Sequence, residues 1–164
     1  MTDFVQVECA IRQLQARCLE AIWRKDAKAY AALFARDGEW KIAGMHMRGQ
    51  AEIEATFARL LGLCERVVTL TSPTLLEVDG KTAVGRTYVT ENAKMLTGQY
   101  AHTIGVYYER FVEEDGAWKY QWRHWALQYR GPSDFSDTFY DSPDYGPFPG
   151  MPAPDEPTTV KKGT

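Results

Sequence analysis

The stretch that decides the fold is QYAHTIGVYYERFVEEDGAWKYQWRHWALQYR, residues 99–130. Two runs rich in aromatic and β-branched residues flank EEDG, which is the pattern of a long antiparallel hairpin. Side chains alternate between the two faces of a strand, so the register decides which of them point inward. If Val112 pairs with Trp118, Arg123 points outward, and a slip of one residue reverses every orientation. The more apolar face, expected toward the core, then includes His102, Tyr108, Trp122 and His124. The opposite face, expected outside, includes Tyr107, Glu109, Arg123 and Trp125.

A second hairpin is predicted upstream of the first. RVVTLTSPTLLEV, residues 66–78, and KTAVGRTYVTEN, residues 81–92, are joined at Asp79-Gly80. A DG pair between two such runs is a strong signal for a hairpin turn. Pro73 predicts a bulge or bend in the first run, because proline has no N–H to donate to a neighbouring strand.

Three helices are predicted before the hairpins. Apolar residues recur at three- and four-residue steps from Phe4 to Lys25, which is the stripe of an amphipathic helix. Cys18 lies on this stripe and Cys9 does not, so Cys18 is expected in the core. The last of the three helices is expected from about Gly49 to Cys64.

The segment between these helices predicts a second helix followed by a strand. Asp26 is placed to cap the helix, which is expected to end at RDG, residues 36–38. Tyr30, Leu33 and Phe34 lie on one face of this predicted helix. EWKIA, residues 39–43, then alternates like a strand and places Trp40 and Ile42 on one side.

The composition excludes several classes of protein. The chain has 164 residues, 45% of them apolar, and a formal net charge of -3, so a nucleic-acid partner has little support. No apolar run approaches a membrane span, and the first ten residues lack the pattern of a signal peptide. Three cysteines without C-x-x-C spacing favour neither a disulfide framework nor a metal site. We therefore expect a cytoplasmic protein without membrane contact.

The composition changes at Gly131, where prolines and aromatic residues become frequent. We expect one domain over residues 1–130 and an extension over residues 131–164. Its aromatic residues predict that the extension is ordered through about Phe148, over the domain or a neighbouring subunit, and disordered towards its end.

Four segments carry a resemblance to a known family: KDAKAYAALFARDGEW, MRGQAEIEATF, LLEVDGKTAVGRTYV and YYERFVEEDGAWKYQWR. They resemble the nuclear transport factor 2-like superfamily and, within it, the SnoaL-like branch. The resemblance implies an α+β, cone-shaped, cystatin-like fold. Three N-terminal helices pack on a strongly curved, mostly antiparallel sheet, and a pocket opens at one end.

The resemblance also implies chemistry and assembly. Members act on small, mostly apolar substrates by general acid–base catalysis without a cofactor. Dimers are common among them, so we expect a homodimer here, formed through the outer face of the sheet. GEWKIAGMHMRG, residues 38–49, is most similar to the scytalone dehydratase and dehydrochlorinase group. Those enzymes use a histidine–aspartate dyad. The matching positions here are Trp23 for the aspartate and Thr69 for the histidine, and neither can remove a proton.

Candidate site residues follow from the predicted register and from the family's pocket. Tyr88 and Glu91 lie on opposite faces of one strand, so one of them at most faces the cavity unless a bulge intervenes. Glu91 in apolar surroundings would have a raised pKa and could serve as acid or base. The predicted catalytic residues are His124, His102 and Tyr88. The predicted ligand-binding residues are Trp23, Trp40, His46, Thr69, Glu91, Tyr108 and Trp122.

Three functions remain open from the sequence. The first is a cofactor-independent lyase or isomerase acting on a small cyclic or aromatic compound, with His124 as the main proton carrier. The second is a non-catalytic protein that binds a small apolar or aromatic ligand in the same cavity. The third is a structural subunit similar to the small beta subunit of ring-hydroxylating dioxygenases.

Overall fold

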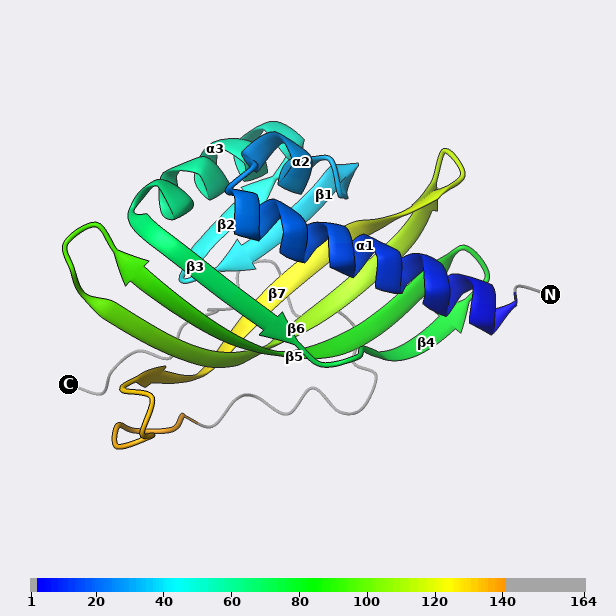
Figure 1. The fold of residues 1–164 in the computed structure, drawn as a ribbon. Coiled ribbons are helices and arrows are strands. Elements are labelled where there is room, and N and C mark those ends of the chain that lie inside the picture. Colours follow the sequence, from blue (N-terminus) through cyan, green and yellow to red (C-terminus); the bar gives the residue numbers. More distant parts are fainter. Residues whose placement is uncertain (1–2, 141–164) are drawn as a thin grey trace.

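The computed structural model describes residues 3–140, which form three helices and seven strands (Figure 1). The helices are α1 (Phe4–Arg24), α2 (Ala27–Ala31) and α3 (Gly49–Gly62). The strands are β1 (Phe34–Ile42), β2 (Met45–Arg48), β3 (Cys64–Thr71), β4 (Leu75–Asp79), β5 (Thr82–Met95), β6 (Tyr100–Glu114) and β7 (Ala117–Gly131).

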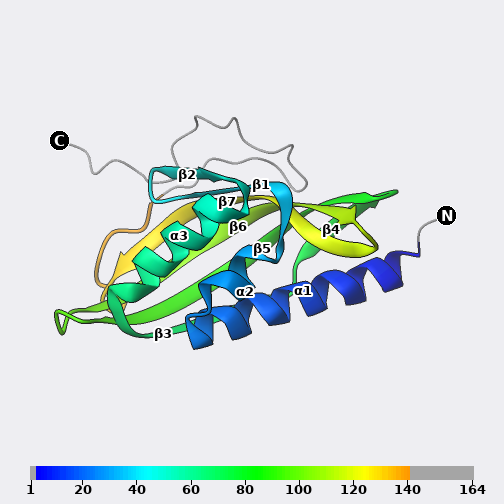
Figure 2. The same cartoon turned by 90° about the horizontal axis from the view of Figure 1, so that it is seen from above.

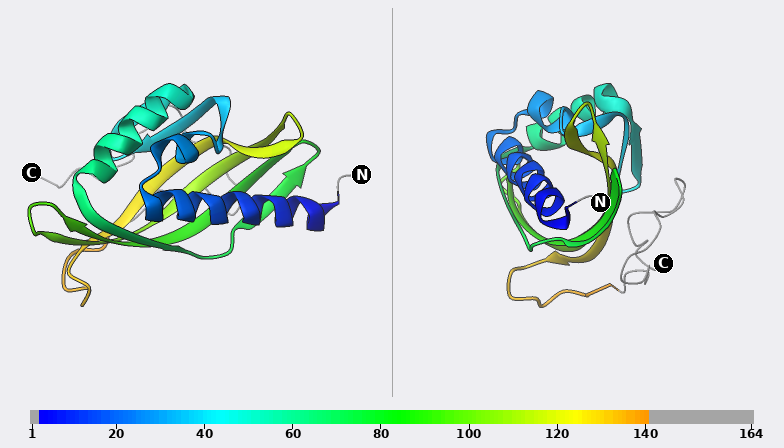
Figure 3. Two further views of the ribbon diagram at one scale, coloured as in Figure 1. Left: turned by 45° about the horizontal axis from the view of Figure 1, so that its top comes forward. Right: turned by 90° about the vertical axis from the view of Figure 1, so that its right-hand side faces the viewer.

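One curved sheet wraps around α1. Its strand order is β2-β1-β7-β6-β5-β3, and β4 also pairs with β5. β1 and β7 run parallel, and the other described pairs are antiparallel. The three helices lie on the concave side, which is plain from above and along the molecule (Figures 2 and 3). The predicted α+β cone is confirmed.

Helix α1 lies along the inside of the cone and forms as its stripe predicts. The Asp3 side chain accepts a bond from the Val5 amide, and Lys25 ends the helix in the left-handed region at φ 54°. Its buried face is Val7, Ile11, Leu14, Cys18 and Ala21. The predicted burial of Cys18 is confirmed, and Cys9 is exposed.

The second helix is shorter than predicted. Asp26 caps α2 by accepting a bond from the Ala29 amide at 2.9 Å, as expected. The prediction that Phe34 belongs to this helix is wrong, because β1 begins there and Phe34 pairs with Tyr120 of β7. RDG therefore lies inside a strand, where the register shifts between Phe34 and Glu39. α2 ends at Ala31, before this signal, because the chain already pairs with β7 from Phe34 onward.

The upstream hairpin forms with a break in its first run. β3 and β4 are separate strands, divided at residues 72–74, and both pair with β5. The bend predicted at Pro73 is thus confirmed. α3 ends at Gly62, slightly earlier than predicted, because Cys64 already belongs to β3 and pairs with Met95.

The predicted register of the β6–β7 hairpin is wrong. Asp115 and Gly116 both have positive φ, 51° and 77°, and form a two-residue turn. Val112 consequently faces Lys119 rather than Trp118. Phe111 then faces Tyr120 and Arg110 faces Trp122, so a bulge adds one residue to β7.

Beyond the bulge, the face that packs on the helices is the opposite of the expected one. Tyr107, Phe111, Tyr120 and Trp125 belong to the main core with α1. The face with His102, Tyr108, Trp122 and His124 lies on the outer side of the sheet. Grouping these four residues together was correct, and directing them toward the helices was wrong.

Residues 132–140 lie against the end of β7. The Tyr129 hydroxyl donates to the Pro132 carbonyl at 2.6 Å, and the Phe139 ring lies 4.5 Å from the Tyr129 ring. The order predicted for residues 141–148 and the disorder predicted beyond lie outside the described residues. Within residues 3–140, no helix is long and apolar enough to cross a membrane. The domain division, the homodimer and the cytoplasmic location stay predictions.

Candidate functional site

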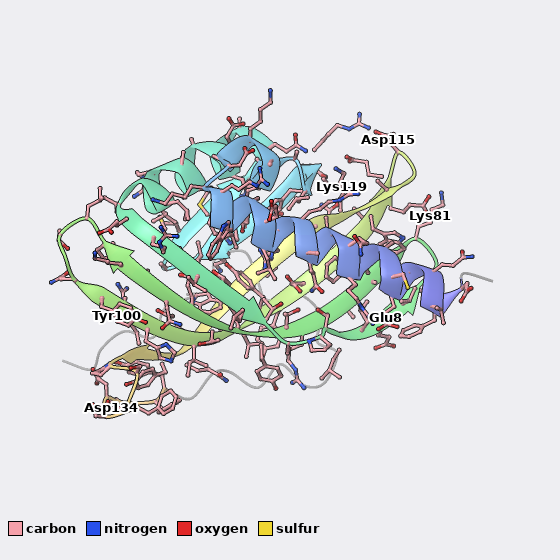
Figure 4. All side chains as sticks on the ribbon, in the orientation of Figure 1. Glu8, Lys81, Tyr100, Asp115, Lys119 and Asp134 are labelled. Carbon is pink, nitrogen blue, oxygen red and sulfur yellow. The ribbon has the colours of Figure 1, made fainter. Side chains whose placement is uncertain are left out.

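A cavity of about 340 Å³ lies between α1, α3 and the concave face of the sheet. α1 contributes Leu19 and Ile22 to its wall, and α3 contributes Phe57. It opens at the end of the cone where the lining residues Leu63 and Arg130 are exposed. This is the end of the sheet that carries Tyr100, opposite the β6–β7 turn with Asp115 (Figure 4). A mostly apolar cavity of this size suits a small organic molecule.

The inner end of the cavity contains a buried ion pair. Arg123 on β7 donates from Nε to Glu109 on β6 at 2.9 Å, and the two residues are 5% and 0% exposed. Thr87 on β5 donates to the other oxygen of Glu109 at 2.7 Å. The guanidinium lies 3.8 Å from the centre of the Tyr107 ring. Both charges are therefore matched inside the protein, which buried charges require.

Four polar side chains form a row across the sheet near the opening. Thr69 faces Glu91, Glu91 faces Thr103, and Thr103 faces Arg130 on successive strands. Residues directly opposite on neighbouring strands point to the same face, and all four line the cavity. We call this set the rim row.

Glu91 is the titratable group of the rim row. Burial raises the pKa of its carboxyl above the ordinary value, while the hydrogen bond from Thr69 and the charge of Arg130 act in the opposite direction. The Thr69 hydroxyl donates to Glu91 Oε2 at 2.9 Å and fixes the side chain. A carboxyl group with a raised pKa in a cavity can serve as an acid or a base.

An apolar stretch separates the rim row from the inner ion pair. Thr87 and Glu91 on β5 set the two polar regions about 13 Å apart along the strand. Between them, Trp125 lies over Gly105, where an added Cβ would be 2.5 Å from two ring carbons and 2.6 Å from the Ala126 carbonyl oxygen. Gly105 is thus needed for the position of the Trp125 ring in the cavity wall.

Gly105→Ala is expected to destabilise the protein by about 1–3 kcal/mol, because the methyl group meets a ring and a backbone oxygen that cannot both move. The tryptophan near-ultraviolet circular dichroism should change with it, and urea unfolding measures the loss. Gly62→Ala is the matched control, since its added Cβ has nothing within 4 Å. An equal response of the two variants would contradict this account.

The structure brings some of the predicted site residues to the cavity. Trp40, Thr69 and Glu91 line it. Of the alternatives Tyr88 and Glu91, Glu91 is the inward one, and Tyr88 is exposed on the outer face. Trp23, at the dyad aspartate position, is 58% exposed and lies beside Arg66.

The predicted histidines lie away from the cavity. His124 stacks on Trp122 with ring centres 5.3 Å apart, and burial lowers the pKa of His124 to about 4. His102 bonds Asn92 through Nδ1 at 2.7 Å. His46 bonds Glu39. Tyr108 lies in a separate outer cluster with Val106 and Ala126. None of these four side chains lines the cavity.

Sequence reasoning missed the residues that replace them. Tyr107, Glu109, Arg123 and Trp125 were assigned to the outer face, and Arg130 was not considered. A two-residue turn at Asp115-Gly116 places Phe111 opposite Tyr120, and alternation then places Tyr107 and Glu109 on the same face of β6 as Phe111. Arg123 and Trp125 follow the bulge, which the turn does not predict. Within residues 3–140, no group of three or more His, Cys, Asp or Glu is placed to hold a metal ion.

Comparison with known proteins agrees with this architecture. Residues 5–124 match the SnoaL-like domain. The chain belongs to the SnoaL-like family. A search of curated proteins gave no match.

Solved structures include several similar folds. Rv3472 from Mycobacterium tuberculosis, a protein of unknown function, is 26% identical, with a TM-score of 0.68 over 76% of this chain and 72% of that one. A putative scytalone dehydratase from Novosphingobium aromaticivorans is 19% identical, with a TM-score of 0.75 over 88% and 98%. The dehydrochlorinase LinA-type3 from Novosphingobium barchaimii is 18% identical, with a TM-score of 0.72 over 84% and 96%. The last two show the shared fold.

Proposed function

We propose that this SnoaL-like protein is a cofactor-independent lyase or isomerase in which Glu91 carries the proton. The supporting observation is the Glu91 carboxyl, which lies in a largely apolar cavity and has a pKa raised by burial. In a lyase, the carboxylate takes a proton from carbon while a leaving group departs from the neighbouring carbon. In an isomerase, the resulting carboxylic acid returns the proton at a second carbon.

Glu91 lies next to the place where the related dyad enzymes have their base. The histidine position of the dyad falls at Thr69, whose hydroxyl bonds Glu91 across β3 and β5. The proposed base therefore lies on β5, one strand away from the dyad position on β3, and Thr69 is the residue that positions it. His124 and His102, which the sequence predicts for this role, do not line the cavity.

The test is a reaction that needs only a base in an apolar cavity. Removal of the ring C–H proton of 5-nitrobenzisoxazole breaks its N–O bond and releases a coloured cyanophenolate. The protein is expected to accelerate this reaction over an equal concentration of acetate. Because the base is the ionised form and the pKa of Glu91 is raised, the rate should increase with pH through a midpoint above that of an ordinary glutamate.

Competition locates the reaction in the molecule. Naphthalene, which is apolar and cannot react, is expected to slow the protein-dependent rate by filling the cavity. A rate no faster than acetate, or a midpoint at the ordinary value for glutamate, would remove Glu91 from this role.

A second candidate is a protein that binds a small apolar ligand without changing it. Trp23 favours it, since an exposed indole stands where the dyad enzymes carry their aspartate. Stoichiometric binding of naphthalene without acceleration of the probe reaction would support this candidate over the enzyme.

A further inference from the structure

The rim row ends in two hydrogen-bond donors that have no acceptor in the described part of the chain. Glu91 takes the bond from Thr69 on one side of the row. On its other side, the Thr103 hydroxyl makes no hydrogen bond within residues 3–140. The Arg130 guanidinium forms no ion pair with a carboxylate of these residues, unlike Arg123 at the inner end. One half of the row is thus satisfied within the protein, and the other half is not.

The two donors are neighbours at the opening of the cavity. Thr103 on β6 lies directly opposite Arg130 on β7, and both line the cavity. Opposite residues of an antiparallel pair have Cβ atoms about 4.5–5.5 Å apart. At this spacing, a hydroxyl and a guanidinium can donate to the two oxygens of one carboxylate. The pair is therefore arranged to bind an anion.

The surroundings decide at which end of the cavity a charged group can lie. At the inner end, Arg123 already balances the fully buried Glu109, so an added carboxylate would be buried without a counter-charge. At the opening, Arg130 is exposed, and an anion bound to it keeps part of its hydration. The wall between the two ends includes the apolar side chains of Val89, Trp125 and Leu127. A charged ligand therefore binds with its charge at the opening and its apolar body inside.

We propose that the substrate of this cavity is a small apolar carboxylic acid, whose carboxylate binds Arg130 and Thr103 while its apolar body fills the cavity. The carbon atoms next to the carboxylate then lie beside Glu91, which is one strand away from Thr103. The positive charge of Arg130 offsets the repulsion between the two carboxylates. The inference deepens the proposed function and rests on it for the reactive carbon, whereas binding of the anion needs no proton transfer.

Three ligands of one shape test the inference. 2-Naphthoate, 2-naphthamide and 2-naphthamidine carry an anionic, a neutral and a cationic group on the same apolar body. Calorimetry on the unmodified protein at neutral pH is expected to give about fivefold tighter binding of naphthoate than of naphthamide, and the weakest binding of naphthamidine. Equal affinity for naphthoate and naphthamide would overturn the proposal. Tightest binding of naphthamidine would do the same, because Glu91 and not Arg130 would then select the ligand.

Two variants locate the contact. Arg130→Gln is expected to bring the affinity for naphthoate down to that for naphthamide, and to leave the affinity for naphthamide unchanged. Thr103→Val keeps the shape of the side chain and should reduce the preference for naphthoate by about twofold, through the loss of one hydrogen bond. Equal losses of naphthoate and naphthamide affinity in Arg130→Gln would show that this side chain only packs against the ligand, and would contradict the proposal.

Arg66 provides the matched control. It is an exposed cation at the same end of the cone, lies 6.0 Å from the centre of the Trp23 ring and does not line the cavity. Arg66→Gln changes the net charge by the same amount as Arg130→Gln and should keep the full preference for naphthoate. A loss equal to that of Arg130→Gln would indicate a general attraction of anions to this end of the protein, and would overturn the assignment of the site.

The two proposals fail separately, because the probe reaction and the ligand series are both measured on the unmodified protein. Probe turnover without a preference for naphthoate defeats only the anion site. A preference for naphthoate without turnover defeats only the role of Glu91, and leaves a protein that binds apolar carboxylic acids without changing them.

Discussion

Glu109→Gln is expected to lower the free energy of unfolding by about 3–5 kcal/mol, the largest loss of stability anticipated for a substitution of this size. The change removes one charge and keeps the shape of the side chain. It leaves Arg123, which is 5% exposed, without its balancing carboxylate. The hydrogen bond from Thr87 at 2.7 Å would also lose its charged acceptor.

Removing both charges should cost much less than removing one. In the double variant Glu109→Gln/Arg123→Met, neither charge of the pair remains, and replacement of a whole buried pair by neutral residues is close to neutral in energy. Urea unfolding of the two single variants and the double variant gives the coupling between the residues directly. We expect the loss in the double variant to be smaller than the sum of the two single losses.

An exposed pair provides the control. Glu65 and Lys94 are 2.8 Å apart with both side chains more than half exposed, so Glu65→Gln should leave the urea midpoint unchanged. Additive losses at Glu109 and Arg123, or an equal response at Glu65, would show that the buried pair is not mutually dependent.

The architecture was largely readable from the sequence because it follows from local patterns. The stripe from Phe4 to Lys25 describes α1 almost to the residue, and Asp26 caps α2 as its position predicts. Both turn sequences, at Asp79-Gly80 and Asp115-Gly116, lie between paired strands. Periodicity and turn chemistry act over a few residues, so a single sequence is enough to read them.

The orientation of β6 and β7 was not readable in this way. The outer face holds Val106, Tyr108 and Trp122, which are all buried, while the inner face carries Glu109 and Arg123. A comparison of apolar content therefore chose the wrong face. The failure arises where a core face carries a compensated ion pair, since each charged residue is scored as exposed although the two satisfy each other.

The residues of the site could be predicted from the sequence only where the alternation of side chains along one strand decided their orientation. Tyr88 and Glu91 had to lie on opposite faces, and this constraint gave Glu91 as one of two possibilities. The bond between Thr69 and Glu91 and the alignment of Thr103 with Arg130 depend on pairing across four strands. Such contacts join residues distant in the sequence, and the register that creates them is a property of the whole sheet.

Glu91→Gln is expected to reduce the probe reaction by about 10²–10⁴-fold, because the amide cannot take up a proton. The same change should stabilise the protein at neutral pH by about 0.5–2 kcal/mol, as expected when a group suited to function and not to stability is replaced. The amide oxygen of glutamine can still accept the bond from Thr69, so the positioning contact at 2.9 Å is kept in neutral form.

The stability gain of the Glu91→Gln variant over the wild type should increase as the pH rises. The pKa of Glu91 is raised in the folded protein, so the folded state binds more protons than the unfolded state between the ordinary and the raised value. The wild type therefore loses stability as pH rises through this window, and the glutamine variant does not. The two proteins should have equal stability in acid and diverge toward neutral pH, measured by urea unfolding across the range. Glu65→Gln, the same exchange at an exposed site, should change neither the rate nor the pH profile. A Glu91→Gln variant that loses both activity and stability would indicate that Glu91 supports the fold. The protein gains stability on this replacement only if the carboxylate is held in the cavity at a cost in solvation.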